Sequence, residues 1–298
     1  MLHYGLPVLF GIMVWWMSTG LLLYLVWQPK EARAKSMAVM TLLLPVALWA
    51  LTASSAETTA TAAYISFAAA LGLWAWHEMS FLLGIVTGPR TLICDKTPGA
   101  RAPLWAAVET VIYHEFAIAL TAALALALTW DAPNQCGTWT FVILGLMRLS
   151  TKINIYLGVP NVTEDFLPKH LAYLKTYFCR RSMNALFPLS ITVSSAITVL
   201  LAQAALSATA TPFETVSFGL LATFAALGVI EHWFLVLPIP AAELWNWSFR
   251  GAKNTGEAPS RNYPSKTHQP LAAQDTSWTA RARDTIDSTH HQTAAAPL

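Results

Sequence analysis

Seven long apolar stretches, separated by more polar segments, follow one another along the first 240 residues of this chain. A hydrocarbon core of about 30 Å is crossed by about 20 apolar residues, because a helix rises about 1.5 Å per residue. Charged residues make up only 11% of the 298 residues, against about a quarter in soluble domains. We therefore expect an all-α integral membrane protein with about seven transmembrane helices, at residues 5–27, 37–54, 62–86, 104–130, 138–158, 184–207 and 213–240.

The lysines and arginines are placed asymmetrically about these stretches. All 18 of them lie at or beyond the same alternate ends, and none lies before the first stretch or in the loops near Glu57, Asp131 and Glu214. Basic loops stay on the cytoplasmic side of a bacterial membrane. The alternation therefore predicts a periplasmic N-terminus and a cytoplasmic C-terminus.

The composition changes after residue 250. Residues 251–298 are rich in Ser, Thr, Ala, Pro, Gln and charge, and they have few large apolar side chains. Such a segment buries too little apolar surface to fold. We expect a polytopic helical membrane domain over 1–250 and a disordered cytoplasmic tail over 251–298.

A second feature of the predicted cytoplasmic side is the connection before the sixth stretch. Pro168 suits the first turn of a helix, and Leu171, Leu174 and Phe178 follow at helical spacing among basic residues. A helix with one apolar and one basic face lies on a membrane surface. We expect a short amphipathic cytoplasmic helix near 168–182.

Three of the predicted membrane helices each carry a histidine next to a glutamate, as His77-Glu78, His114-Glu115 and Glu231-His232. Counted at about 1.5 Å per residue, all three histidines are expected roughly 12–15 Å inside the cytoplasmic helix ends. Ionisable groups in a bilayer are costly and usually face a partner or a functional cavity. We predict one shared polar layer, with Arg148, Lys152 and Asn154 supplying counter-charges.

The side chains of this layer form a ligand set suited to iron, zinc or manganese. The candidate metal ligands are His77, Glu78, Glu109, His114, Glu115, Glu231 and His232. Neither His-Glu pair continues as HExxH, and the Glu-x-x-His pattern of soluble di-iron bundles is absent. The individual motifs are weak, and their shared depth is the stronger indication of a site.

Two other interpretations of the layer stay open. The His and Glu side chains can pin helices together through buried hydrogen bonds and ion pairs. Alternatively, one of the three histidines ligates the magnesium of a bacteriochlorophyll or a related tetrapyrrole cofactor. The aromatic residues expected to pack on such a ring are Trp74, Trp76 and Trp233. A retinal protein is disfavoured because the last apolar stretch has no lysine for a Schiff base.

Five segments carry a family resemblance over roughly residues 1–250. They are Trp-His-Glu-Met-Ser-Phe-Leu-Leu-Gly at 76–84, Thr-Gly-Pro-Arg at 87–90, Asn-Ile-Tyr-Leu-Gly-Val-Pro-Asn at 154–161, Phe-Leu-Pro-Lys-His-Leu at 166–171 and Asn-Ala-Leu-Phe-Pro at 184–188. Through them the chain resembles the PuhE family, photosynthetic complex assembly protein 2 of purple phototrophic bacteria. No catalytic residue is carried over with this resemblance.

The resemblance implies a multi-pass protein of the bacterial inner membrane, cytoplasmic or intracytoplasmic. It implies an assembly factor for photosynthetic reaction-centre or light-harvesting complexes, linked to bacteriochlorophyll supply. The expected partners are membrane lipid, subunits of those complexes and pigment, with no nucleic acid. The alternative is a membrane metalloenzyme that acts on a tetrapyrrole or another lipophilic substrate.

Overall fold

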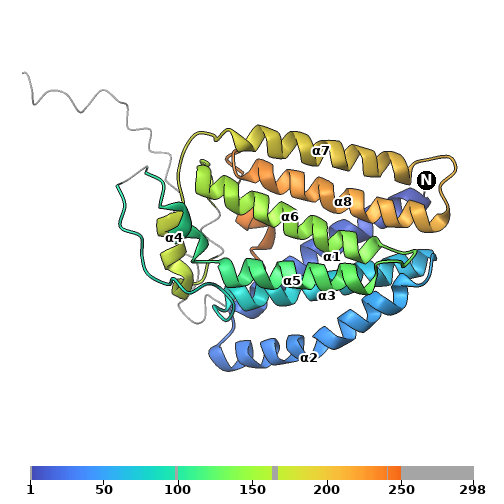
Figure 1. The fold of residues 1–298 in the computed structure, drawn as a ribbon, viewed down its shortest axis with the longest axis horizontal. Helices are drawn as coiled ribbons and strands as arrows, with labels where there is room; N and C mark the ends of the chain where they lie inside the picture. The colour runs from blue at the N-terminus through green and yellow to red at the C-terminus, as the bar shows by residue number, and fades with distance from the viewer. Residues whose placement is uncertain (1, 98–99, 163–166, 240, 250–298) are drawn as a thin grey trace, which may run out of the picture. The chain divides into compact units, whose positions relative to one another are not determined.

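The computed structural model describes residues 2–97, 100–162, 167–239 and 241–249, and all regular structure within these ranges is helical. The elements are α1 (Leu2–Val26), α2 (Lys30–Ser55), α3 (Ala60–Leu82), α4 (Leu104–Val108), α5 (Ile112–Leu128), α6 (Cys136–Leu157), the 3₁₀ helix η2 (Lys169–Tyr177), α7 (Leu186–Ala205), α8 (Pro212–Phe234) and the 3₁₀ helix η3 (Ala241–Trp245) (Figure 1). The predicted tail, 251–298, lies outside the described residues.

Among the residues that the structure describes, five helices are long and apolar enough to cross a membrane: α1, α2, α6, α7 and α8. The chain is therefore a multi-pass membrane protein. The other two predicted spans, 62–86 and 104–130, correspond to α3 and to α4 plus α5, which fall outside this set. α5 is only 17 residues long, and α3 ends in a more polar stretch that includes His77 and Glu78.

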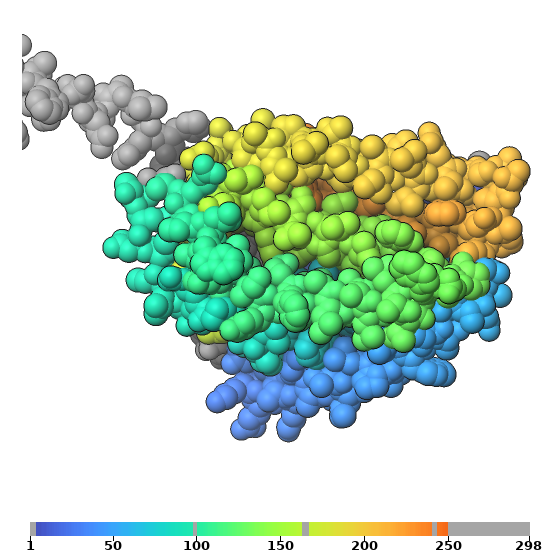
Figure 2. Space-filling view, in the orientation of Figure 1, coloured from blue at the N-terminus to red at the C-terminus, as the bar shows by residue number. Residues whose placement is uncertain are grey.

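The middle of the bundle is formed by α3 and α8. α3 packs against α1, α2, α6 and α8, while α8 also packs against α7. α2 and α7 lie at opposite edges of the view in Figures 1 and 2, with apolar side chains such as Leu42 and Leu200 exposed. Lipid tails solvate such side chains, so the outer helices must be apolar. The central α3 tolerates polar residues because its neighbours cover it.

Two helix starts show why the sequence folds where it does. Thr59 precedes α3, and its hydroxyl accepts a hydrogen bond from the N–H of Ala62 at 3.1 Å. Thr211 and Glu214 form a capping box at the start of α8, with Pro212 in the first turn. These side chains satisfy N–H groups that have no partner within the helix.

The helices are connected at two ends. At one end the turns are short, and the Asn134 side chain before α6 donates to the Ser54 carbonyl of α2 at 2.9 Å. At the other end longer segments meet, and Lys96 donates to the Phe178 carbonyl at 2.7 Å. The lysines and arginines of the described residues belong to segments at or near this second end, as the charge alternation predicted. We call it the basic end.

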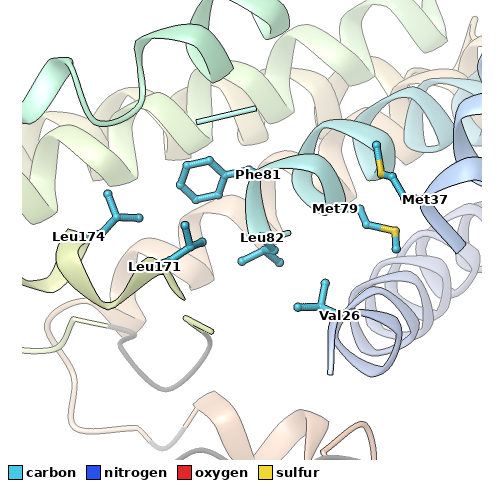
Figure 3. Packing of buried hydrophobic residues seen from close by; sticks show 7 residues of the cluster. All are labelled: Val26, Met37, Met79, Phe81, Leu82, Leu171 and Leu174. Carbon is cyan, nitrogen blue, oxygen red and sulfur yellow. The ribbon is translucent and has the colours of Figure 1, made fainter. Parts of the chain in front are cut away.

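The expected amphipathic helix at 168–182 is shorter than predicted, and its apolar side contacts other helices of the protein. It is η2, which ends at Tyr177 because Phe178 is extended. Leu171 and Leu174 are buried and pack, in one apolar cluster, with Phe81 and Leu82 of α3 and Val26 of α1 (Figure 3). The apolar side of η2 therefore covers the basic end of the protein core.

The expected single helix over 104–130 is broken. α4 ends at Val108, α5 begins at Ile112, and the loop that carries Thr-Gly-Pro-Arg fills the break. The N–H of His114 donates to the Thr87 carbonyl at 3.0 Å, and the N–H of Arg90 donates to the Glu109 carbonyl at 3.2 Å. Backbone groups that leave a helix need other hydrogen-bond partners, and this loop supplies them. Gly88 is required there, because an added Cβ would lie 2.1 Å from the Glu109 oxygen.

Candidate functional site

The first His-Glu pair divides its side chains between two neighbours of α3. His77 is buried, and its Nε2 hydrogen-bonds with the Thr121 hydroxyl of α5 at 2.9 Å. The Glu78 carboxylate accepts a hydrogen bond from the Arg148 guanidinium of α6 at 3.1 Å. Adjacent helical residues point about 100° apart, so the two side chains reach different helices.

The second pair is divided in the same way. His114 is completely buried, with its ring 4.6 Å from that of Phe81 and 6.4 Å from that of His77 between centroids. Neither of its ring nitrogens has a hydrogen-bond partner. The Glu115 carboxylate pairs with the Lys152 ammonium, which also lies 5.4 Å from the Phe81 ring centre.

The third pair joins α8 to α1 and α6. The Glu231 carboxylate accepts a hydrogen bond from the Trp15 indole at 2.9 Å. His232 is completely buried, with Nδ1 2.8 Å from the Gly228 carbonyl and Nε2 2.9 Å from the Ser150 hydroxyl. A carbonyl only accepts, so Nδ1 carries the proton and Nε2 is left to accept from Ser150.

The predicted counter-charges are confirmed for two of three residues. Arg148 and Lys152 pair with glutamates, whereas Asn154 donates to the Ser150 carbonyl and the Ser190 hydroxyl. Glu109 lies in the break and pairs with Arg90 at 2.9 Å. This hydrogen bond raises the pKa of Arg90, so the guanidinium stays charged.

The three pairs lie nearer the helix ends than the predicted 12–15 Å. His77 is five residues from the end of α3, about 7.5 Å of helix, while His114 and His232 are each two residues from an end. The apolar runs continue past these points, but the chain turns there instead of remaining helical. The loop before α4, η2 and η3 form the basic end beyond these helix ends.

The candidate metal ligands are not brought together. Within the described ranges, no group of three or more His, Cys, Asp or Glu side chains is placed to hold a metal ion. His77 and His114 are neighbours, whereas His232 is held by Ser150 and Gly228. The seven-residue metal set stays a prediction.

The aromatic residues of the predicted tetrapyrrole site lie in different surroundings, and the Trp76 ring lies 5.1 Å from the His77 ring between centroids. Trp74 lines an internal cavity, Trp76 donates to the Thr41 hydroxyl at 3.0 Å, and Trp233 packs on Phe187. His114 has free ring nitrogens, yet its complete burial leaves no surface to which a ring can bind. The tetrapyrrole interpretation stays a prediction.

The cavity was not predicted from the sequence. It measures about 370 Å³ and is lined by residues of α1, α3, α4, α6, α8, η2 and η3. Its charged lining residues are Glu78, Arg148, Lys152 and Glu231. Its wall is otherwise mainly apolar and includes Trp15 and Trp74. The recurrence of tryptophan on the first and third helices was the available signal, but membrane tryptophans are common at interfaces.

Fold and site together define a class: a multi-pass helical membrane protein with ion pairs on the wall of an internal apolar cavity. Residues 1–256 match the family described as "Protein of unknown function (DUF3623)", and the chain belongs to that family. A protein of Rhodobacter capsulatus named "Uncharacterized 30.4 kDa protein in puhA 5'region" is 34% identical over 268 residues, covering 88% of this chain and 96% of the relative. No solved structure matches the chain.

Proposed function

We propose that this protein is an assembly factor for photosynthetic reaction-centre or light-harvesting complexes, linked to bacteriochlorophyll supply. The observation that carries the proposal is the nearly full-length similarity to a protein of the puhA 5′ region. The sequence resemblance to the PuhE family supports the same role. The partners are membrane lipid and subunits of these complexes.

The proposed topology has seven crossings of the bacterial inner membrane, with the N-terminus in the periplasm. In it α3 and the α4–α5 pair cross the membrane together with the five apolar helices. The concentration of lysine and arginine at the basic end supports a cytoplasmic location of that end. In this topology α3 crosses in spite of its polarity because α1, α2, α6 and α8 pack against it, and the short α5 packs against α6, α3 and α2.

The proposed functional centre is the group of ion pairs beside the cavity, together with His77 and His114. Its support is the placement of charged side chains, only 13–38% exposed, between helices whose packing needs no charge. Glu78–Arg148 and Glu115–Lys152 hold α3 and α5 against α6. Ion pairs of this kind are weak evidence for stability but common in sites that bind or move polar groups.

A test uses a purple phototrophic bacterium from which its own family member has been deleted. The full chain is expected to restore the near-infrared absorption of reaction-centre and light-harvesting complexes in membranes. The Glu78→Gln variant is expected to restore it poorly, and the matched Glu57→Gln variant, in the exposed turn before α3, is expected to restore it fully. Normal complexes in the deletion strain would contradict the assembly role.

A membrane metalloenzyme is the other function predicted from the sequence. It needs a metal, and the described residues do not assemble a set of three ligands. Our proposal therefore contains no metal-dependent step. Stoichiometric iron, zinc or manganese in the purified protein, lost in the His77→Ala variant, would reverse this choice.

A further inference from the structure

The cavity has the size and lining of a ligand pocket. Its volume of about 370 Å³ lies within the range of about 300–1,000 Å³ that is usual for small-molecule sites. Trp15, Trp74 and Phe224 contribute aromatic surface from α1, α3 and α8. A few charged groups on an apolar wall fix the orientation of a ligand whose body is lipophilic.

One of the charged side chains that line the cavity has no ion-pair partner among the described residues. Glu78 pairs with Arg148, and Glu115 pairs with Lys152. Among the described residues Glu231 takes part in no ion pair, and its hydrogen bond comes from the neutral indole of Trp15. Of the charged residues that line the cavity, Glu231 is therefore the one without an ion pair among the described residues.

An unbalanced carboxylate inside a membrane protein favours a particular kind of partner. Charge transferred from water into an apolar interior costs several kcal/mol unless it is paired. Glu231 is exposed and lines the cavity, so a balancing group reaches it from the cavity. A ligand with an anionic end would be repelled by Glu231, whereas a cationic ligand would pair with it.

The aromatic wall favours the same partner. The indole of Trp15 touches Glu231 through its N–H and lies at the cavity surface. The face of an indole attracts cations, most strongly where water is excluded. The Glu231 carboxylate and the aromatic wall therefore both favour a positively charged ligand.

We propose that this cavity binds a lipophilic amine or another lipophilic cation, with its charged end at Glu231 and its apolar body along Trp15, Trp74 and Phe224. This site goes beyond the assembly role, because it concerns what the purified protein binds. It does not require a metal or any change in the two ion pairs.

The test measures binding to the purified full chain in nanodiscs of phosphatidylcholine. Isothermal titration calorimetry with decylamine, decanol and decanoate compares three heads on one apolar body, and the heat from empty nanodiscs is subtracted. A charge-assisted hydrogen bond predicts that decylamine binds at least about tenfold more tightly than decanol, with decanoate weakest. Equal binding of the three compounds would overturn the proposal.

Two variants assign the binding to the cavity. Glu231→Gln is expected to weaken decylamine binding at least about tenfold and to leave decanol unchanged, whereas Glu57→Gln changes neither. Ala75→Phe, on the cavity wall in α3, is expected to abolish binding of decylamine and decanol by filling the space. Each variant is first shown to unfold cooperatively. Undiminished decylamine binding to either cavity variant would contradict the site, whatever the outcome of the assembly experiment.

Discussion

Gly88→Ala is the sharpest test of the break between α4 and α5. The new Cβ would lie 2.1 Å from the Glu109 carbonyl oxygen, 2.6 Å from the Thr110 carbonyl carbon and 2.8 Å from the Val111 nitrogen. Ordinary contacts of this kind begin at about 3.4 Å, and all three atoms are backbone that no side-chain rotation can move. Overpacking costs about 1–3 kcal/mol, and we expect the upper end, about 3 kcal/mol.

The assay is the thermal unfolding midpoint of the purified protein in nanodiscs. A loss of about 3 kcal/mol lowers the midpoint by about 6–12 °C for a domain of this size. The matched control is Gly145→Ala in α6, where the new Cβ would lie 3.5 Å from Ile118, an ordinary contact. Alanine is the better helix former by about 1 kcal/mol, so this variant should be as stable as the parent or more so.

The two variants separate a local clash from a general intolerance of substituted glycines. If the unfolding midpoint of Gly88→Ala lies within about 2 °C of that of the parent, the backbone at Gly88 is not in close contact with residues 109–111, and the reasoning fails. If both variants lose equal stability, the effect does not come from the Glu109 carbonyl.

Three further predictions address the ion pairs, the buried histidine and the topology. Glu78→Gln should lower the unfolding free energy by about 2–3 kcal/mol, which is less than the loss of a fully buried pair because the Arg148 side chain is 38% exposed. In the double variant with Arg148→Gln, part of this loss should be recovered. If the losses of the two single variants simply add, the two side chains do not form the pair. His114→Phe should stabilise the protein by about 1 kcal/mol, because neither ring nitrogen has a hydrogen-bond partner. The same variant should lower the amount of assembled photosynthetic complex. A destabilised variant would show that His114 has a hydrogen-bond partner in the native protein. In intact cells, an impermeant maleimide should label a Thr209→Cys variant and leave Cys94 unlabelled, and the reverse pattern would invert the orientation.

Local patterns predicted the helices and the identity of most charge partners. Long apolar runs mark membrane helices directly, and Arg148 and Lys152 were the basic residues at matching depth. The break at Glu109–Val111 escaped prediction because an apolar run does not show where its backbone leaves the helix. Thr-Gly-Pro-Arg was readable as a turn, but its contact with that break is a tertiary feature.

The cavity and the separation of the three histidines depend on contacts that sequence spacing does not contain. Glu231 meets Trp15 across 216 positions of the chain, so no local pattern connects them. The metal interpretation required all three histidines to turn toward one point. His232 instead finds Ser150 and its own helix carbonyl at Gly228, which satisfy both ring nitrogens without a metal.

The order of the paired residues along the chain determines when each ion pair can form during biosynthesis. In both pairs the acid is made before the base: Glu78 precedes Arg148 by 70 positions, and Glu115 precedes Lys152 by 37. At about 5–20 residues per second, Glu78 waits about 4–14 s for its partner to leave the ribosome. During this interval α3 carries an unpaired acid and is not among the helices apolar enough to cross alone. In the proposed seven-span topology, stable insertion of α3 is completed only when α6 arrives, and a chain truncated before α6 should be recognised as unfinished by membrane quality control.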